Sequence, residues 1–321
     1  HQYIERSEKI MKKEIMQKTA VVWLLAMVCC LLWGSAFPCV KIGYDLFRIG
    51  ASDTASQIVF AGTRFFLAGV LALILGSLSQ KRVLIPRKKD LPKIGVLAMF
   101  QTILQYLFFY IGLAHTTGVK SSIIEAANVF IAILIASLIF HQEKLTRRKM
   151  IGCVIGFAGV VLINLSGGGM DMSFQWNGEL FILFSTIAYA MSSVFIKKYS
   201  AESDPVLLSG WQFCFGGLVM VLAGKIMGGS LTFYETACVP LLLYMAFISA
   251  VAYSLWAVLL KYNPVSRVTV FGFMNPVFGV ILSALLLNEN GQAFSLRGLT
   301  SLILVCVGIY IVNRSGEQME K

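Results

Sequence analysis

A single acidic side chain placed inside an apolar stretch is the strongest chemical signal in this chain. Glu125 lies well within a predicted membrane segment, whereas every aspartate lies in a predicted loop. It shares one helical face with Ser121 and Asn128, because the three residues follow an i, i+4, i+7 spacing. An ionisable group at the centre of a bilayer costs about 2.5–3.5 kcal/mol on insertion scales, so it normally faces a cavity or a partner. The spacing therefore predicts a polar stripe that faces the interior of a helical bundle.

Two interpretations of Glu125 stay open. In the functional interpretation, the carboxylate binds a cationic group, a proton, or each in turn, because a site away from water favours the neutral form of an acid. In the structural interpretation, the carboxylate forms a fixed ion pair with Lys120 or Arg64. We favour the functional interpretation, since ionisable residues within membrane segments usually mark a functional site.

Arg64 is the matching basic residue, near the middle of the predicted helix 56–78. Its guanidinium is able to hold a ligand carboxylate through two parallel hydrogen bonds. In the alternative, it donates to carbonyl groups of neighbouring helices and serves as a structural charge. Both interpretations require Arg64 to face the interior of the protein.

Aromatic and amide side chains supply the other candidates for a binding site. Beside Glu125 and Asn128, the substrate-binding candidates are Trp33, Ser35, Phe37, Gln105, Tyr106, Tyr189, Tyr253, Trp256 and Asn275. Together they are suited to line a cavity for an apolar or amphipathic solute. Ordinary packing and interfacial anchoring explain most aromatics in membrane proteins and remain the alternative. Pro38 and Pro276 are candidate hinges, because proline removes a backbone donor and bends a helix.

Ten apolar stretches carry these residues, and a helix that crosses a bilayer needs about 20 apolar residues. We expect helices at 20–41, 56–78, 92–113, 118–140, 148–165, 179–197, 206–227, 238–260, 266–287 and 297–313. The chain is 57% hydrophobic and 13% charged, whereas a soluble domain has roughly 25% charged residues. The sequence therefore predicts an all-α polytopic membrane protein with ten transmembrane helices.

The last five stretches read as a second copy of the first five. Tyr106 corresponds to Tyr253 and Glu143 to Glu289, in preserved order. An odd number of helices inserts the second copy upside down, which gives two inverted-topology five-helix repeats. We expect the repeats at 20–165 and 179–314, an extracytoplasmic linker at 166–178, and cytoplasmic segments at 1–19 and 315–321. The concentration of Lys and Arg on one side places both termini in the cytoplasm.

Several short motifs recur along the chain in a fixed order. They are Trp33-Gly34-Ser35-Ala36-Phe37, Arg64-Phe65-Phe66-Leu67-Ala68, Asn275-Pro276 with the later Glu289, and the Gly152/Gly159 spacing echoed by Ser301/Gly308. Over residues 20–314 the chain thereby resembles the EamA branch of the drug/metabolite transporter superfamily. The resemblance implies a cavity between two halves and a structural role for Arg64, since an arginine there is common across many substrates. One departure is Phe130, which stands where the second copy has Pro276.

Other classes of protein lack support in the sequence. No P-loop follows Gly167-Gly168-Gly169, and neither H-E-x-x-H nor G-x-S-x-G occurs, so we expect no enzyme. The seven cysteines show no C-x-x-C spacing, and we expect no metal site and no cofactor. The net charge of +11 is distributed between apolar stretches, which argues against nucleic acid as a partner.

We therefore expect a monomeric secondary active transporter in a bacterial-type plasma (inner) membrane. The resemblance implies export of amino acids or related small amphipathic metabolites by alternating access, driven by protons or another gradient. A small-molecule substrate and the lipid bilayer are the expected partners. The alternatives are an organic-cation or multidrug proton antiporter and, from a different class, a membrane receptor or scaffold.

Overall fold

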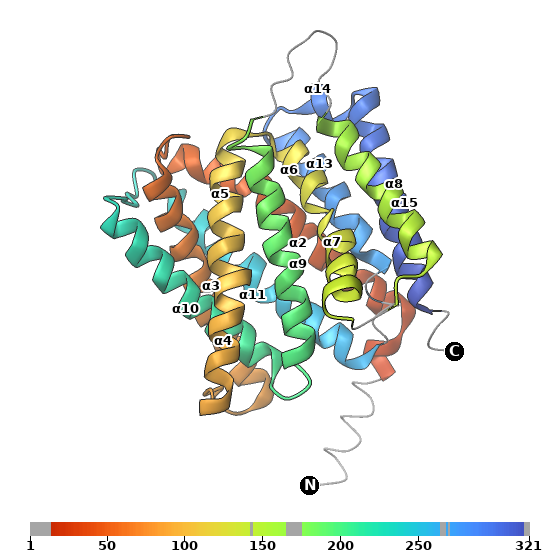
Figure 1. The fold of residues 1–321 in the computed structure, drawn as a ribbon. Helices are drawn as coiled ribbons and strands as arrows, with labels where there is room; N and C mark the ends of the chain where they lie inside the picture. Colours follow the sequence, from red (N-terminus) through yellow and green to blue (C-terminus); the bar gives the residue numbers. More distant parts are fainter. Residues whose placement is uncertain (1–13, 142–143, 165–174, 264–267, 269, 318–321) are drawn as a thin grey trace.

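Every regular element in the described part of the chain is helical. The computed structural model describes residues 14–141, 144–164, 175–263, 268 and 270–317. The elements are α2 (Thr19–Leu46), α3 (Thr54–Gln80), η1 (Lys88–Asp90), α4 (Leu91–Leu97), η2 (Ala98–Leu104), α5 (Gln105–His115), α6 (Gly118–Glu125), α7 (Asn128–Leu134), η3 (Ile135–Ile139), α8 (Arg147–Asn164), α9 (Glu179–Tyr199), α10 (Pro205–Ile226), α11 (Cys238–Tyr262), η4 (Val270–Phe273), α13 (Met274–Leu286), α14 (Asn290–Ala293) and α15 (Leu296–Glu317). The short elements η1 and η4 are 3-10 helices, and η2 and η3 are π-helical. For these ranges the all-α prediction is confirmed, and the helices form one bundle (Figure 1).

Several predicted features lie wholly or partly outside the described residues. They are Glu143, most of the linker 166–178, the greater part of the segment 1–19 and the end of the tail 315–321.

Eight helical segments are long and apolar enough to cross a membrane. They are Thr19–Leu46, Thr54–Gln80, Lys88–His115, Gly118–Ile139, Glu179–Tyr199, Pro205–Ile226, Cys238–Trp256 and Leu296–Asn313. The two other predicted spans fall on α8, which begins with Arg147-Arg148-Lys149, and on the shorter apolar helix Phe271–Leu286. The count of ten transmembrane helices therefore stays a prediction.

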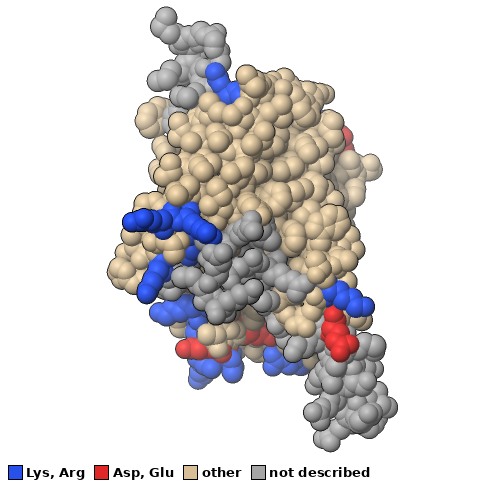
Figure 2. All heavy atoms as spheres, turned by 90° about the vertical axis from the view of Figure 1, so that its right-hand side faces the viewer, with Lys and Arg blue, Asp and Glu red and all other residues tan. Residues whose placement is uncertain are grey.

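The surface carries the side chains expected of a protein in lipid. Large apolar residues such as Leu78, Val154 and Ile303 are more than half exposed, which is unfavourable in water but not against acyl chains. On the face shown in Figure 2, a broad uncharged surface lies above Lys and Arg side chains gathered toward the end of the bundle opposite α14. This distribution fits a polytopic membrane protein.

Glycines allow the closest helix contacts in the bundle. α3 and α10 run side by side and each has a glycine every seven residues, which is about two turns and therefore one helical face. These glycines are Gly62, Gly69 and Gly76 in α3 and Gly210, Gly217 and Gly224 in α10. A Cβ atom at Gly217 would lie 2.4 Å from the backbone nitrogen of Phe66. α8 and α15 approach in the same way, since a Cβ atom at Gly308 would lie 2.6 Å from the carbonyl oxygen of Gly152.

The helices between these two glycine interfaces enclose the interior of the protein. α2 packs against α11 and α13, and α6 packs against α13 and α9. Two of these helices are interrupted at membrane depth. α6 ends at Glu125 and α7 begins at Asn128, with a turn between them. Such interruptions are tolerated in lipid only where the freed backbone groups face protein or a cavity.

The predicted continuous helix over 266–287 is wrong in detail. A 3-10 turn at Val270–Phe273 precedes α13, and Pro276 is the third residue of α13. A proline in the first turn removes no intrahelical hydrogen bond, because the first amides of a helix have no internal acceptor. The discontinuity therefore lies before Pro276.

The Gly217 contact gives a test of the α3–α10 packing. We expect Gly217→Val to lower the free energy of unfolding by about 1–3 kcal/mol, because the added carbons overlap the α3 backbone. Thermal unfolding in detergent measures this change. Gly95→Ala is the matched control, since a Cβ atom at Gly95 meets nothing within 4 Å. Equal unfolding midpoints for the two variants would contradict the packing.

Candidate functional site

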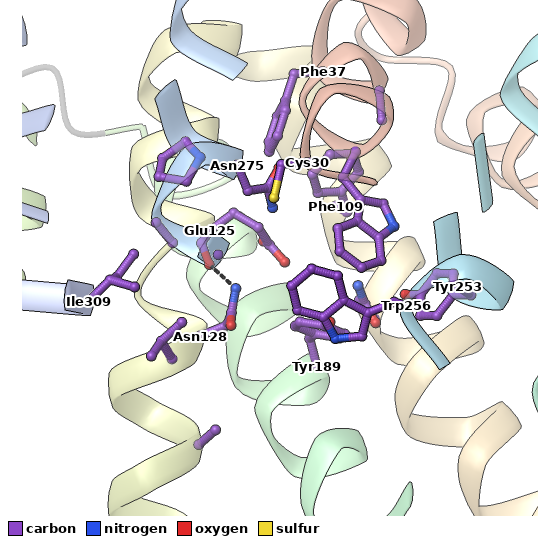
Figure 3. A pocket seen from close by; sticks show the side chains of 18 of the residues that line it. Cys30, Phe37, Phe109, Glu125, Asn128, Tyr189, Tyr253, Trp256, Asn275 and Ile309 are labelled. Carbon is purple, nitrogen blue, oxygen red and sulfur yellow. Dashed lines mark hydrogen bonds between the residues drawn. The ribbon is translucent and has the colours of Figure 1, made fainter. Parts of the chain in front are cut away.

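A cavity of about 350 Å³ lies among α2, α5, α6, α7, α11 and α13 (Figure 3). All but one of the predicted substrate-binding residues line it: Trp33, Phe37, Gln105, Tyr106, Glu125, Asn128, Tyr189, Tyr253, Trp256 and Asn275. Arg64 and Pro276 also line it. Residues far apart in the sequence are thus brought to one site of the size typical for small ligands.

Glu125 is buried at the end of α6, and its carboxylate has one described hydrogen-bond partner. The Thr186 hydroxyl on α9 donates to Oε2 over 3.1 Å. The Asn128 side-chain amide donates to the backbone carbonyl of Glu125 over 2.7 Å and so closes the turn before α7. Figure 3 shows the Glu125 side chain extending toward the centre of the cavity. The carboxylate is therefore available to a ligand.

The predicted ion pair of Glu125 with Lys120 or Arg64 does not form among the described residues. Lys120 pairs instead with Glu179, with Nζ and Oε1 2.9 Å apart. Glu125 thus faces the cavity without a described basic partner. A buried carboxylate in that situation favours a proton or a cationic ligand.

Arg64 is buried, and each of its three guanidinium nitrogens donates to the protein. Nε donates to the Met245 carbonyl over 3.2 Å, Nη1 to the Tyr110 hydroxyl over 3.2 Å and Nη2 to the Ser249 hydroxyl over 3.3 Å. The guanidinium carbon also lies 4.8 Å from the Phe65 ring centre, a cation–π distance. These contacts join α3, α5 and α11, as the structural interpretation of Arg64 expects.

Aromatic rings form much of the cavity wall and pack edge-on against one another. The Trp33 ring centre lies 5.3 Å from that of Trp256 and 5.6 Å from that of Tyr253. On the α5 side, Phe109 packs against Phe37 with centres 5.5 Å apart. Rings held by such contacts present fixed faces to a ligand, which suits an apolar or cationic group.

Two amide groups of the cavity lack hydrogen-bond partners in the described structure. Gln105 Oε1 on α5 and Asn275 Oδ1 on α13 are buried, and neither has a partner. Buried amides are nearly always hydrogen-bonded in proteins, to water or a ligand if not to protein. These groups are therefore suited to bind the polar part of a solute.

Ser35 and Pro38 do not line the cavity. The Ser35 hydroxyl donates to the Leu32 carbonyl over 2.7 Å and lies 2.9 Å from the Tyr244 hydroxyl. Pro38 is buried inside α2. Both lie on the helix that carries Trp33 and Phe37, but their side chains leave on other faces.

Sequence reasoning missed two polar contributors to the site. Thr186 binds Glu125, and Ser249 binds Arg64 and lines the cavity. Helical spacing would have found them, since Thr186 precedes Tyr189 by three residues and Ser249 precedes Tyr253 by four. The described residues contain no group of three or more His, Cys, Asp or Glu side chains suited to a metal ion.

An all-helical bundle with eight membrane-length segments around a polar and aromatic cavity defines a polytopic membrane protein. The chain belongs to the EamA-like transporter family, which matches residues 21–165 and again residues 176–314. It is therefore a multi-pass membrane transporter, and its transporter domain occurs twice.

Similar proteins agree with this assignment. An "Uncharacterized transporter" of Archaeoglobus fulgidus is 28% identical over 298 residues, with 91% of this chain and 98% of the relative covered. A "Probable amino-acid metabolite efflux pump" of Salmonella typhimurium is 26% identical, with 89% and 93% covered. A solved structure titled "Crystal structure of protein" has a TM-score of 0.64 and 16% identity, and the match covers 94% of this chain and 99% of that one. That structural likeness concerns the fold alone.

The contacts of Arg64 predict a stability role. We expect Arg64→Ala to lower the thermal unfolding midpoint markedly, because it leaves three buried acceptors unpaired at about 1–3 kcal/mol each. Arg64→Lys should recover only part of the loss, since an ammonium lacks the planar fork. Arg82→Ala is the control, because it removes only an exposed ion pair with Asp204. Similar midpoints for Arg64→Ala and Arg82→Ala would rule out the structural role.

Proposed function

We propose that this transporter is secondary active and exports amino acids or related small amphipathic metabolites by alternating access. Its location would be a bacterial-type plasma membrane, and its energy would come from protons or another gradient. The observation that carries the proposal is the Glu125 carboxylate, which faces the cavity and has only the Thr186 hydroxyl as a described partner. Such a group is able to bind a substrate ammonium and a proton in turn, which is what coupled transport requires.

The remaining cavity groups suit the other parts of such a solute. Trp33, Tyr253 and Trp256 provide an apolar wall for a side chain or a face for an ammonium group. The amides of Gln105 and Asn275 are suited to hold a carboxylate through their N–H groups. The name of the Salmonella typhimurium relative points in the same direction.

Pseudo-equivalent contacts support an inverted repeat as the basis of alternating access. The spacing that relates Tyr106 to Tyr253 also relates Thr102 to Ser249, and Arg64 corresponds to Gln212. Arg64 Nη2 donates to Ser249, and the Thr102 hydroxyl donates to Gln212. Each bond joins one copy to the other in the same way. Together with the double match to the family, this favours ten helices in two inverted halves, with both termini cytoplasmic.

A second candidate function is proton-coupled antiport of organic cations. It is favoured by Arg64, whose three nitrogens donate to protein acceptors. The cavity then offers one carboxylate and no described uncommitted basic group, so its charge would suit a solute with a positive group and no carboxylate. The two candidates differ in what Gln105 and Asn275 bind.

Counterflow uptake in proteoliposomes tests the role of Glu125. We expect Glu125→Gln to reduce counterflow of labelled amino acids at least tenfold, because the amide binds neither an ammonium strongly nor a proton. The fold should survive, since glutamine still accepts a hydrogen bond from Thr186. Glu235→Gln makes the same change at an exposed position and should transport normally. Wild-type counterflow by Glu125→Gln would exclude this carboxylate from the transport path.

A matched pair of solutes separates the two candidate functions. Phenylalanine and phenylalaninamide have the same ring and ammonium group, but only the first has a carboxylate. Preferred counterflow of phenylalanine, lost in Gln105→Leu, would support the amino-acid proposal. Preference for the amide, with Gln105→Leu unchanged, would overturn it in favour of the cation antiporter.

A further inference from the structure

Polar contacts join the two family-matched segments at the end of the bundle where α14 lies (Figure 1). We call this group the clasp. Its members are Thr116, Thr117, Gly118, Val119 and Lys120 from the first segment and Glu179, Glu289 and Gln292 from the second. All first-segment members lie at or just before the start of α6.

Glu289 attaches the first turn of α6 to the α13–α14 region. Its Oε1 accepts from the Gly118 backbone N–H over 3.1 Å, and its Oε2 accepts from that of Val119 over 2.9 Å. These amides have no acceptor within their own helix, and a negative charge is favourable at a helix N-terminus. The Thr117 hydroxyl donates to the Gln292 side-chain oxygen beside them.

Glu179 holds the same turn from the α9 side. Its Oε1 accepts from Lys120 Nζ over 2.9 Å and from the Thr116 hydroxyl over 2.9 Å. The Glu179 carboxylate is 3% exposed, so the pair is shielded and weakly screened by salt. Lys41 of α2 donates to the Thr116 carbonyl and thereby joins a third helix to the turn.

The cavity extends away from the clasp. Its lining continues from Glu125 along α7 to Ile133 and along α15 to Asn313, toward the end where α2 begins and α15 ends. Gly118 precedes Glu125 by seven residues, or roughly 10 Å along a helix. Helix α6 therefore has the clasp at its start and the cavity carboxylate at its end.

We infer that the clasp is the gate at the α14 end of the transporter, and that α6 links its release to the occupancy of Glu125. The inference rests on the proposed alternating access, which requires this end to open at one stage of the cycle. The described structure then represents the state in which this gate is shut. Opening separates Glu179 and Glu289 from the first turn of α6 and gives the cavity access to the α14 end.

Side-specific thiol labelling tests the gate without any substrate, so it remains interpretable if the tested solutes are not transported. Ser121→Cys, in a full-length background lacking the seven native cysteines, places a thiol at a buried position between the clasp and Glu125. A membrane-impermeant maleimide is added to vesicles of each orientation. We expect slow labelling from the α14 side, and labelling about fivefold or more faster from that side after Lys120→Met. Combining Lys120→Met with Glu289→Gln should accelerate it further.

Two controls make the outcome decisive. Lys225→Met removes a lysine that is exposed near the end of α10 and should leave the labelling rate unchanged. Ala51→Cys reports an exposed position and should react equally in every variant. Unchanged labelling at position 121 in the double clasp variant would overturn the inference. Equal acceleration from both sides of the membrane would also overturn it, because the clasp would then only stabilise the fold.

Discussion

The interior of this protein depends on the absence of water in the bilayer, which leaves every polar group to be satisfied by protein, ligand or a proton. Arg64 meets this constraint fully, because each guanidinium nitrogen has a protein acceptor on a neighbouring helix. Glu125 meets it only in part, through Thr186. Two ionisable residues at similar depth thereby receive different roles: one fixes three helices, and the other remains open to the cavity.

The sequence was informative about the fold because the bilayer sets both the length and the polarity of a spanning helix. It was less informative about interruptions. The turn at Ala126–Ala127 and the 3-10 segment before Met274 lie inside continuous apolar runs, where hydropathy does not change. Their cause is tertiary, since the freed backbone groups face neighbouring helices and the cavity. The apolar pattern alone therefore predicts spans better than it predicts where they bend.

The site was recognised from the sequence through the rarity of its residue types. A carboxylate in an apolar helix is unusual, so Glu125 was easily singled out, and Thr186 was missed because threonine is common in such helices. Ser35 shows the opposite error, since its motif suggested a cavity position while its hydroxyl bonds within the helix interior. Direction around a helix decides such cases, and a helix surrounded by apolar residues on all sides gives no moment from which to read it.

The contacts of the two copies across α3 and α10 are related, but the residues that make them are not the same. Arg64 has a charge where its counterpart Gln212 has none, and Gln212 bonds to Gln101 and Thr102 instead. A cavity between identical halves would present the same chemistry in two opposite directions, and a polar solute could bind head-first or tail-first. Here the charge difference removes that degeneracy, so a solute in the cavity meets one preferred orientation.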